Sequence, residues 1–405
     1  MNVSLVAVEG CCHGELDKIY ERIKNFELEN GTKVDILFCC GDFQAIRDES
    51  DLNELSCPQK YREYRDFRDY YSGVKLAPLL TVFIGGNHEA PDFLRNLYFG
   101  GWVAPNIYYL GHSGVLNFGG IRIGGISGIY NLNDYTKGIL LLKQLFKGYF
   151  ESKPYNEQTK RSSYHMREFD VKKLSLIKGK VDVFLSHDWP AGIENFGDLD
   201  QLLKIKPFFY EDIKNNTLGN PKTMELMGKL KPTLWFSAHL HVKYEAEYKH
   251  EDGSTTQFLA LDKVLPYREF LRIIQLDPDN SSNKRKLESP VPVEVTPKLC
   301  YDREWCAILV ANRDKMPLNQ FSSVNPITLN EPLEKDFEFV DQRFNESGYE
   351  TLTLDGNTFF VIPFKDDAHK EPESQREAFM SLLDLPTNNY FRPGTQDKMT
   401  VNFVE

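Results

Sequence analysis

Five short blocks of this sequence each bring a metal-ligating or proton-transferring side chain to the end of an apolar run. The first block, in "VAVEGCCHGEL", places two cysteines and a histidine between glycines. The blocks are, in chain order, Cys11-x-His13, Asp42 in "CGD", Asn87 and His88 in "GGNHE", His187 in "LSHDWP", and His239 and His241 in "SAHLH". Each block alone is common in proteins, but all five in this order are not expected by chance.

These side chains suit a site that holds two divalent cations. Thiolate, imidazole, carboxylate and amide oxygen are all ligands of first-row metals. A carboxylate such as Asp42 can bridge two ions ~3.5–4 Å apart, and two such ions acidify a shared water and neutralise a phosphoryl group. His88 directly follows Asn87 and suits a general acid for a leaving oxygen. The residues alone leave open whether Cys11 and Cys12 serve chemistry or packing.

The segments that must position these side chains have the pattern of buried strands. "VSLVAVEG", "VDILFCCGDF" and "PLLTVFIGGNHEA" are continuous apolar runs, and a helical spacing of apolar residues follows the first run. The helix is predicted from Leu16, Ile19, Tyr20, Ile23 and Phe26. Such β-α-β units with fully apolar strands predict a sheet that is covered on both faces.

Further strands are expected after this first part of the chain. Residues 107–130 are short apolar runs broken by glycines, which is typical of hairpins. The later runs "VDVFLSHDWP", "TLWFSAHLHVKYEAEY", "TQFLALDKV" and "FLRIIQLDP" also have the composition of strands. Nearer the C-terminus, "YDREWCAILVANRD" and "FVIPF" are predicted to be strands, and "ESQREAFMSLLDL" is predicted to be a helix.

Composition excludes several classes of protein. No apolar run approaches the ~20 residues that a membrane span needs, and the first residues lack the basic start of a signal peptide. The seven cysteines are odd in number and include two adjacent pairs, which is unlike a disulfide framework. Cys39 and Cys40 are expected to be packing residues. An intracellular protein of two or three domains is therefore expected from the 405 residues.

Charge is unevenly distributed along the chain. The net charge of −11 argues against binding of nucleic acid by the whole surface. Residues 131–180, however, hold 11 basic and 5 acidic side chains, a local excess of +6. This basic segment is either a solvated helical face or a local site for a polyanion. Residues 131–165 within it are polar and rich in tyrosine, and loops of this length are usually functional or disordered.

The blocks resemble the signature of the calcineurin-like metallophosphoesterase superfamily, with two departures. Cys11 stands where the first aspartate of that signature normally stands, and Ala238 replaces a glycine. The first departure narrows the resemblance to the family of RNA lariat debranching enzymes. Further blocks over roughly residues 1–312 are similar to that family, namely "GDFQAIRD", "GGIRIGGISGIY", "YHMR", "FLALDKVLP" and "YDREWCAIL".

The resemblance implies an α/β fold, a four-layer αββα metallophosphoesterase sandwich with a smaller C-terminal domain. The expected division is a catalytic domain over 1–275, a linker over 276–297 and a C-terminal debranching-enzyme domain over 298–405. Residues 131–165 would be a lariat-recognition loop within the catalytic domain.

The resemblance also implies the ligands of each ion. One ion would be held by Cys11, His13, Asp42 and His241, and the other by Asp42, Asn87, His187 and His239. Cys12 would then be a packing residue on the opposite face of the strand. A thiolate favours softer ions, so the two divalent ions are expected to be Fe(II) or Zn(II), with Mn(II) supporting activity in vitro.

The implied reaction is hydrolysis of the 2′–5′ phosphodiester bond at the branch point of excised intron lariats, with His88 as general acid. Branched RNA is the expected partner, and single-stranded RNA is commonly bound by stacking on aromatic side chains. The candidate RNA contacts are Tyr130, Tyr135, Tyr164, His165 and Arg167. For the three residues of "YHMR" a capped or salt-bridged helix start is an equal alternative.

Two other functions remain open at this point. One is another dinuclear metallophosphoesterase, a nuclease or a phosphatase, and the other is a non-catalytic scaffold of the same fold. The eroded ligand set that a scaffold predicts is not found, because all seven ligand positions carry usable side chains. The substrate implies a nuclear protein, with the cytoplasm as a second expected location. The family implies a monomer or weak assemblies, and no membrane partner is expected.

Overall fold

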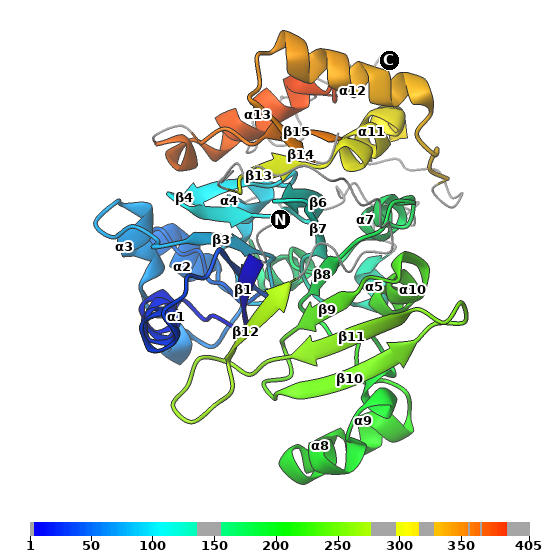
Figure 1. The fold of residues 1–405 in the computed structure, drawn as a ribbon. Helices are drawn as coiled ribbons and strands as arrows, with labels where there is room; N and C mark the ends of the chain where they lie inside the picture. Colours follow the sequence, from blue (N-terminus) through cyan, green and yellow to red (C-terminus); the bar gives the residue numbers. More distant parts are fainter. Residues whose placement is uncertain are drawn as a thin grey trace, which may run out of the picture.

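Two β-sheets form the centre of the protein (Figure 1). The computed structural model describes residues 4–135, 155–276, 297–315, 328–354, 357–364 and 367–386. The strand pairs in the middle of each sheet are parallel, and antiparallel strands extend the edges. Parallel strands of this kind direct their carboxyl ends toward one edge of the sheet, which is where ligand sites of α/β proteins form.

The first sheet has six strands in the order β12-β1-β2-β3-β5-β4. Its strands are β1 (Ser4–Glu9), β2 (Ile36–Cys39), β3 (Leu80–Phe83), β4 (Gly101–Ala104), β5 (Ile107–Tyr109) and β12 (Leu271–Leu276). The second sheet has nine strands in the order β10-β11-β9-β8-β7-β6-β13-β15-β14. Its strands are β6 (Ser113–Phe118), β7 (Ile121–Ile126), β8 (Val183–Ser186), β9 (Leu234–Ser237), β10 (Tyr244–Lys249), β11 (Thr255–Ala260), β13 (Leu299–Tyr301), β14 (Thr351–Leu354) and β15 (Asn357–Val361).

Alternate side chains of the central strands enter different cores, which creates a four-layer αββα arrangement. Val6 and Val8 of β1 pack between the two sheets, together with Val183 and Leu185 of β8. Ala7 of β1 points the other way and joins a core beneath helices. Because strand side chains alternate between faces, a strand that is buried on both sides reads as a continuous apolar run. The expected fold is therefore the observed one.

Helices cover the outer face of each sheet. Those on the first sheet are α1 (Leu16–Asn30), α2 (Glu49–Glu54), α3 (Phe67–Tyr71) and α4 (Pro91–Asn96). Those on the second sheet include α7 (Glu168–Leu174), α10 (Pro221–Leu230), α11 (Arg303–Ala311), α12 (Glu334–Glu346) and α13 (Pro372–Leu382). Shorter helices are α5 (Leu132–Tyr135), α6 (Glu157–Ser162), α8 (Leu199–Ile205) and α9 (Tyr210–Lys214).

One predicted strand is wrong. Most of "YDREWCAILVANRD" forms the helix α11, and only its first residue belongs to the short strand β13. The Asp302 side chain accepts a hydrogen bond from the backbone N–H of Trp305 and so caps the helix. Residues 305–310 are all buried, and a helix that is buried on all sides has the same continuous apolar sequence as a buried strand.

The C-terminal segments continue the second sheet. β13 pairs with β6 on one side and with β15 on the other, so these strands share hydrogen bonds with the rest of that sheet. The predicted linker lies almost entirely outside the described residues, as does much of the predicted recognition loop, from 136 to 154. Within the described ranges, no helix is both long and apolar enough to cross a bilayer.

Candidate metal centre

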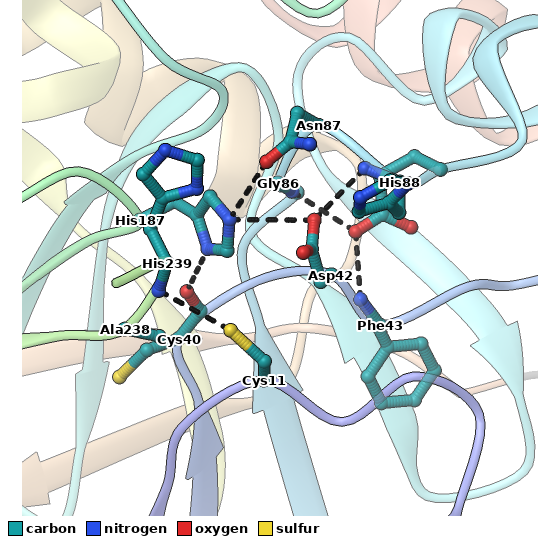
Figure 2. A network of polar contacts seen from close by, with 12 residues as sticks. Cys11, Cys40, Asp42, Phe43, Gly86, Asn87, His88, His187, Ala238 and His239 are labelled. Carbon is teal, nitrogen blue, oxygen red and sulfur yellow. Dashed lines mark hydrogen bonds and ion pairs between the residues drawn. The ribbon is translucent and has the colours of Figure 1, made fainter. Parts of the chain in front are cut away.

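The five blocks meet where strands of the two sheets end. Cys11 and His13 follow β1, Asp42 follows β2, and Asn87 follows β3. From the second sheet, His187 follows β8, and His239 and His241 follow β9. Figure 2 shows the side chains of Asp42, Asn87 and His187 turned toward one another. The parallel strands of the two sheets thus bring all seven predicted ligands to one place.

Cys11, His13, Asp42 and His241 form the tighter group. Each offers one potential ligand atom, and these four atoms all lie within 4.8 Å of one another. The Nε2 atoms of His13 and His241 are 3.4 Å apart, and Nε2 of His13 is 3.8 Å from Oδ2 of Asp42. This is the donor set that was predicted for the first ion.

A second group forms around His187 on the other side of Asp42. Nε2 of His187 is 3.3 Å from Oδ1 of Asp42 and 3.2 Å from Oδ1 of Asn87. The ring of His239 lies 4.9 Å from the ring of His187. Nδ1 of His187 donates to the backbone carbonyl of Cys40 at 2.7 Å, so Nε2 is the nitrogen that can face a cation. The carboxylate of Asp42 therefore has one oxygen directed to each group.

Four of these ligands have left-handed backbone conformations. The φ angles are +46° at His13, +47° at Asp42, +62° at His239 and +49° at His241. Residues other than glycine adopt this region only at a cost of about 1–3 kcal/mol each, and such residues cluster at functional sites. The strained backbone turns side chains from the strand ends inward to a common point.

Glycines make room for the ligands. A Cβ atom on Gly86 would lie 2.2 Å from Oδ1 of Asp42 and 2.8 Å from Nε2 of His187. A Cβ atom on Gly41, whose φ is +105°, would lie 2.3 Å from Nδ1 of His187. The two loops can therefore approach His187 this closely only because these positions lack side chains.

The electrostatics of the donor set fit a divalent cation. Burial lowers the pKa of His13 to about 4 and that of His241 to about 3, which keeps both imidazoles neutral as metal binding requires. Burial and the nearby Asp42 raise the pKa of the Cys11 thiol well above its usual value. The backbone N–H of His239 donates to Sγ of Cys11 at 3.2 Å and favours the thiolate. A positive ion is what would stabilise this thiolate fully.

Asp42 is ionised despite its burial. Desolvation opposes its negative charge, but the imidazoles of His187, His88 and His13 outweigh that effect and hold its pKa well below the usual range. The same interaction with Asp42 overcomes burial at His187 and raises its pKa to about 9. A cation bound here would therefore displace a proton from His187.

His88 lies beside the ligands. Its backbone N–H donates to Oδ1 of Asp42 at 2.8 Å, and its ring is 5.6 Å from the ring of His13. The side chain is half-buried and its ring nitrogens are not among the clustered ligand atoms. This position is compatible with the predicted role in proton transfer.

Glu89 is a positioning residue that the sequence reasoning missed. Its Oε1 accepts hydrogen bonds from the backbone N–H groups of Phe43 and Gly86, and its Oε2 accepts one from Gln44. The carboxylate thus joins the loop after β2 to the loop after β3. Burial raises its pKa to about 8. The only sequence signal was its place directly after His88 in "GGNHE".

The five predicted RNA contacts differ in exposure. Tyr130 and Tyr164 are half-buried, whereas Tyr135 is 8% exposed. His165 bonds to Asp134, and Arg167 donates from its guanidinium to the carbonyls of His165 and Ser162. Arg167 is also the residue before α7. These contacts favour the structural alternative for His165 and Arg167, and their contact with RNA stays a prediction.

Tyr164 has a different environment. It lines a cavity of about 40 Å³ together with Gly86, Glu89 and Lys160, directly behind the metal-ligand loop. Lys160 donates to the backbone carbonyl of Asn53 at 2.9 Å, which ties α6 to α2.

Comparisons with known proteins agree with this geometry. Residues 4–243 match the family model of the calcineurin-like phosphoesterases, and residues 253–388 match that of the lariat debranching enzyme C-terminal domain. The lariat debranching enzyme of Arabidopsis thaliana is 48% identical over 324 residues, which are 80% of this chain and 70% of that protein. The human enzyme is 52% identical over 315 residues, and lariat debranching enzyme A of Xenopus laevis 50% over 314. These two matches cover 76% of this chain but only 54% of each relative, so the chain spans about half of their length.

Gly86→Ala should damage the metal centre without unfolding the protein. The added methyl group would overlap Oδ1 of Asp42, so we expect the affinity for divalent cations to fall about 10- to 100-fold. Metal titration of the purified variant measures this. Gly228→Ala in α10 is the matched control, because a methyl group there meets no heavy atom within 4 Å and should stabilise the helix slightly. Unchanged metal affinity in Gly86→Ala would contradict the assignment of Asp42 and His187 as ligands.

Proposed function

Because the chain belongs to the lariat debranching enzyme family of calcineurin-like phosphoesterases, we propose that it hydrolyses the 2′–5′ phosphodiester bond at the branch point of intron lariat RNA. The observation that carries the proposal is the convergence of Cys11, His13 and His241 on Asp42. Cys11 replaces the aspartate of the wider superfamily, and the relatives that share most of this sequence carry the name of this activity.

The protein's own residues have distinct parts in the proposed reaction. When bound, two divalent cations would lower the pKa of a water molecule and screen the charge of the phosphoryl oxygens. The two carboxylate oxygens of Asp42 point toward the two groups of predicted ligands. The surrounding imidazoles lower the pKa of Asp42 and so keep its carboxylate negatively charged. Attack of hydroxide on phosphorus breaks the bond to the 2′ oxygen. The imidazole of His88 gives that oxygen its proton, so the products are a 2′-hydroxyl and a linear RNA with a 5′-phosphate.

We further propose Fe(II) or Zn(II) for the ion at Cys11, since a thiolate prefers softer ions than Mg(II). Mn(II) is expected to support turnover in vitro. A non-catalytic scaffold is disfavoured because a scaffold has no need of four strained ligands and two loop glycines that accommodate them. A nuclear location and a monomeric state follow from the proposed substrate and family, and they belong to the same proposal.

The substrate is tested with a branched RNA, a linear RNA and a linear DNA of equal length and matching base sequence. We expect metal-reconstituted protein to cleave a branched RNA at its 2′–5′ bond and to leave linear 3′–5′ RNA and DNA intact. Denaturing gels with end-labelled substrates identify the broken bond. Preferential cleavage of the linear substrates would instead assign the site to a general nuclease.

His88→Ala should separate chemistry from metal binding. Loss of a general acid lowers turnover by about 10²–10⁴, so we expect this decrease with near-normal metal content. Single-turnover rates on branched RNA, combined with elemental analysis, measure both quantities. If the variant lost an ion while the remaining holoenzyme kept its full rate, His88 would be a ligand and not an acid.

Cys11→Asp should shift the metal preference toward harder ions. Replacing thiolate by carboxylate favours Mn(II) over Fe(II) and Zn(II), and anaerobic activity with each single ion gives the ranking. Cys12→Ala is the control, because Cys12 packs in the core beneath α1 on the opposite face of the chain. We expect Cys12→Ala to rank the three ions by activity in the same order as the wild type. If Cys11→Asp also kept the wild-type order, the thiolate of Cys11 would be removed from the proposed ligand set.

A further inference from the structure

The loop between β11 and β12 is attached to the metal-ligand strand through its backbone. Cys11 forms a parallel β-bridge with Lys263, in which Cys11 donates to the carbonyl of Asp262 and Val264 donates to the carbonyl of Cys11. Both N···O distances are 3.4 Å. Gly10 permits this approach, because a Cβ atom there would lie 2.2 Å from the Asp262 carbonyl oxygen. The sequence block "LDKVLP" is therefore held rigidly beside the metal centre.

The bridge directs the Lys263 side chain toward the metal centre. Bridged residues project from the same side of the paired chains, and successive residues alternate. Val264 enters the helix-side core together with Cys12, so Lys263 shares the face of Cys11. The side chain of Lys263 is therefore on the same side of the bridge as that of Cys11.

Within the described part of the chain, the ammonium group of Lys263 forms no ion pair. Among the residues that the structure describes, no carboxylate oxygen lies within 4.0 Å of the ammonium groups of Lys263 or Lys206. Lys206 directly precedes the 3₁₀ helix η3 (Pro207–Phe209). Burial lowers the pKa of Lys206, the nearby carboxylate of Asp262 opposes this shift, and the charges of Arg268 and Lys263 add to it. Arg268 is half exposed and contacts Asp262 at 3.3 Å. Lys263, Lys206 and Arg268 thus form a local group of cations on a protein whose net charge is −11.

Exposed aromatic rings accompany these cations. Tyr267 at the tip of the loop is fully exposed and has a left-handed φ of +63°. Phe208 of η3 is 68% exposed, and the ammonium of Lys206 lies 5.8 Å from the centre of its ring. Cations interleaved with exposed aromatic rings are the composition of surfaces that bind single-stranded nucleic acid, where phosphates pair with the cations and bases stack on the rings.

We propose that Lys263, Lys206, Arg268 and Tyr267 form a second RNA-binding surface, which holds one strand of the branched substrate beside the ions. Lys263 binds the phosphate nearest the metal centre, Lys206 and Arg268 bind phosphates farther along, and Tyr267 stacks on a base. The inference rests on the proposed function, since it takes RNA as the ligand. It assigns substrate contacts to a part of the chain distant in sequence from the basic segment 131–180.

The test measures binding without cleavage. Wild type, Lys263→Gln and the double variant Lys206→Gln/Arg268→Gln are loaded with metal and titrated with a branched RNA whose branch linkage is a non-hydrolysable methylenephosphonate. We expect each variant to bind about 10-fold more weakly at physiological salt. The slope of log Kd against log salt should decrease by about 0.7 for each phosphate contact that is lost. Tyr267→Ser should weaken binding about 5- to 100-fold, whereas Tyr267→Phe should retain it.

The controls separate a lost contact from a damaged fold. Lys249→Gln in β10 removes an exposed cation from the sheet that contains β11. This variant should bind the branched RNA as tightly as the wild type does. Metal content and unfolding temperature of each variant show whether the centre is intact. If the wild type prefers branched RNA and the variants match it in Kd and in salt slope, the second surface is wrong while the proposed function stands. If the wild type does not prefer branched over linear RNA, the proposed function itself fails, and this inference fails with it.

Discussion

The carboxylate of Asp42 is 1% exposed and lies between imidazoles that come from both sheets. A buried charge of this kind costs several kcal/mol unless opposite charges and hydrogen bonds compensate it. Its Oδ1 accepts the backbone N–H of His88, and its two oxygens face two groups of ligands. Each of the surrounding loops therefore has to place either a hydrogen-bond donor or a metal-binding side chain next to the carboxylate of Asp42. The remaining elements of the site keep the carboxylate of Asp42 and these loops in position.

Holding these loops in place requires support from residues that bind no ion. The left-handed backbone at His13 and His239 and the close approach at Gly86 are unfavourable for isolated loops. They persist because the strands before them are packed on both faces and because Glu89 cross-links two loops through three backbone N–H groups. Rigid strands and a buried cross-link thus give the ligands a fixed geometry before any ion arrives, which is the arrangement that favours tight and selective binding.

Much of this could be predicted from the sequence, for a physical reason. Strands buried on both faces leave continuous apolar runs, and polar residues at their ends leave short blocks, so the layers and the meeting of the seven predicted ligands could be predicted. Glu89 was not, because its role depends on the backbone N–H groups of Phe43 and Gln44, which are far from it in sequence. The helix α11 was mistaken for a strand because uniform burial erases the periodicity that distinguishes the two. The cations around Lys263 were also missed, because Lys206 is far from Lys263 in sequence and the bridge between Lys263 and Cys11 is a tertiary contact.

The pairing of β1 with β12 has a consequence for biosynthesis. β1 leaves the ribosome long before its antiparallel neighbour, residues 271–276, with Ser4 opposite Leu276. The bridge between Cys11 and Lys263 and the ligands His239 and His241 also come late in translation. Until residues 271–276 have emerged, one edge of β1 stays unpaired, and until residues 239–264 have emerged, Cys11 lacks its contacts with His239 and Lys263. With the proposed ligand set, the ions can load only late in synthesis, and the Cys11 thiol has to stay reduced until then.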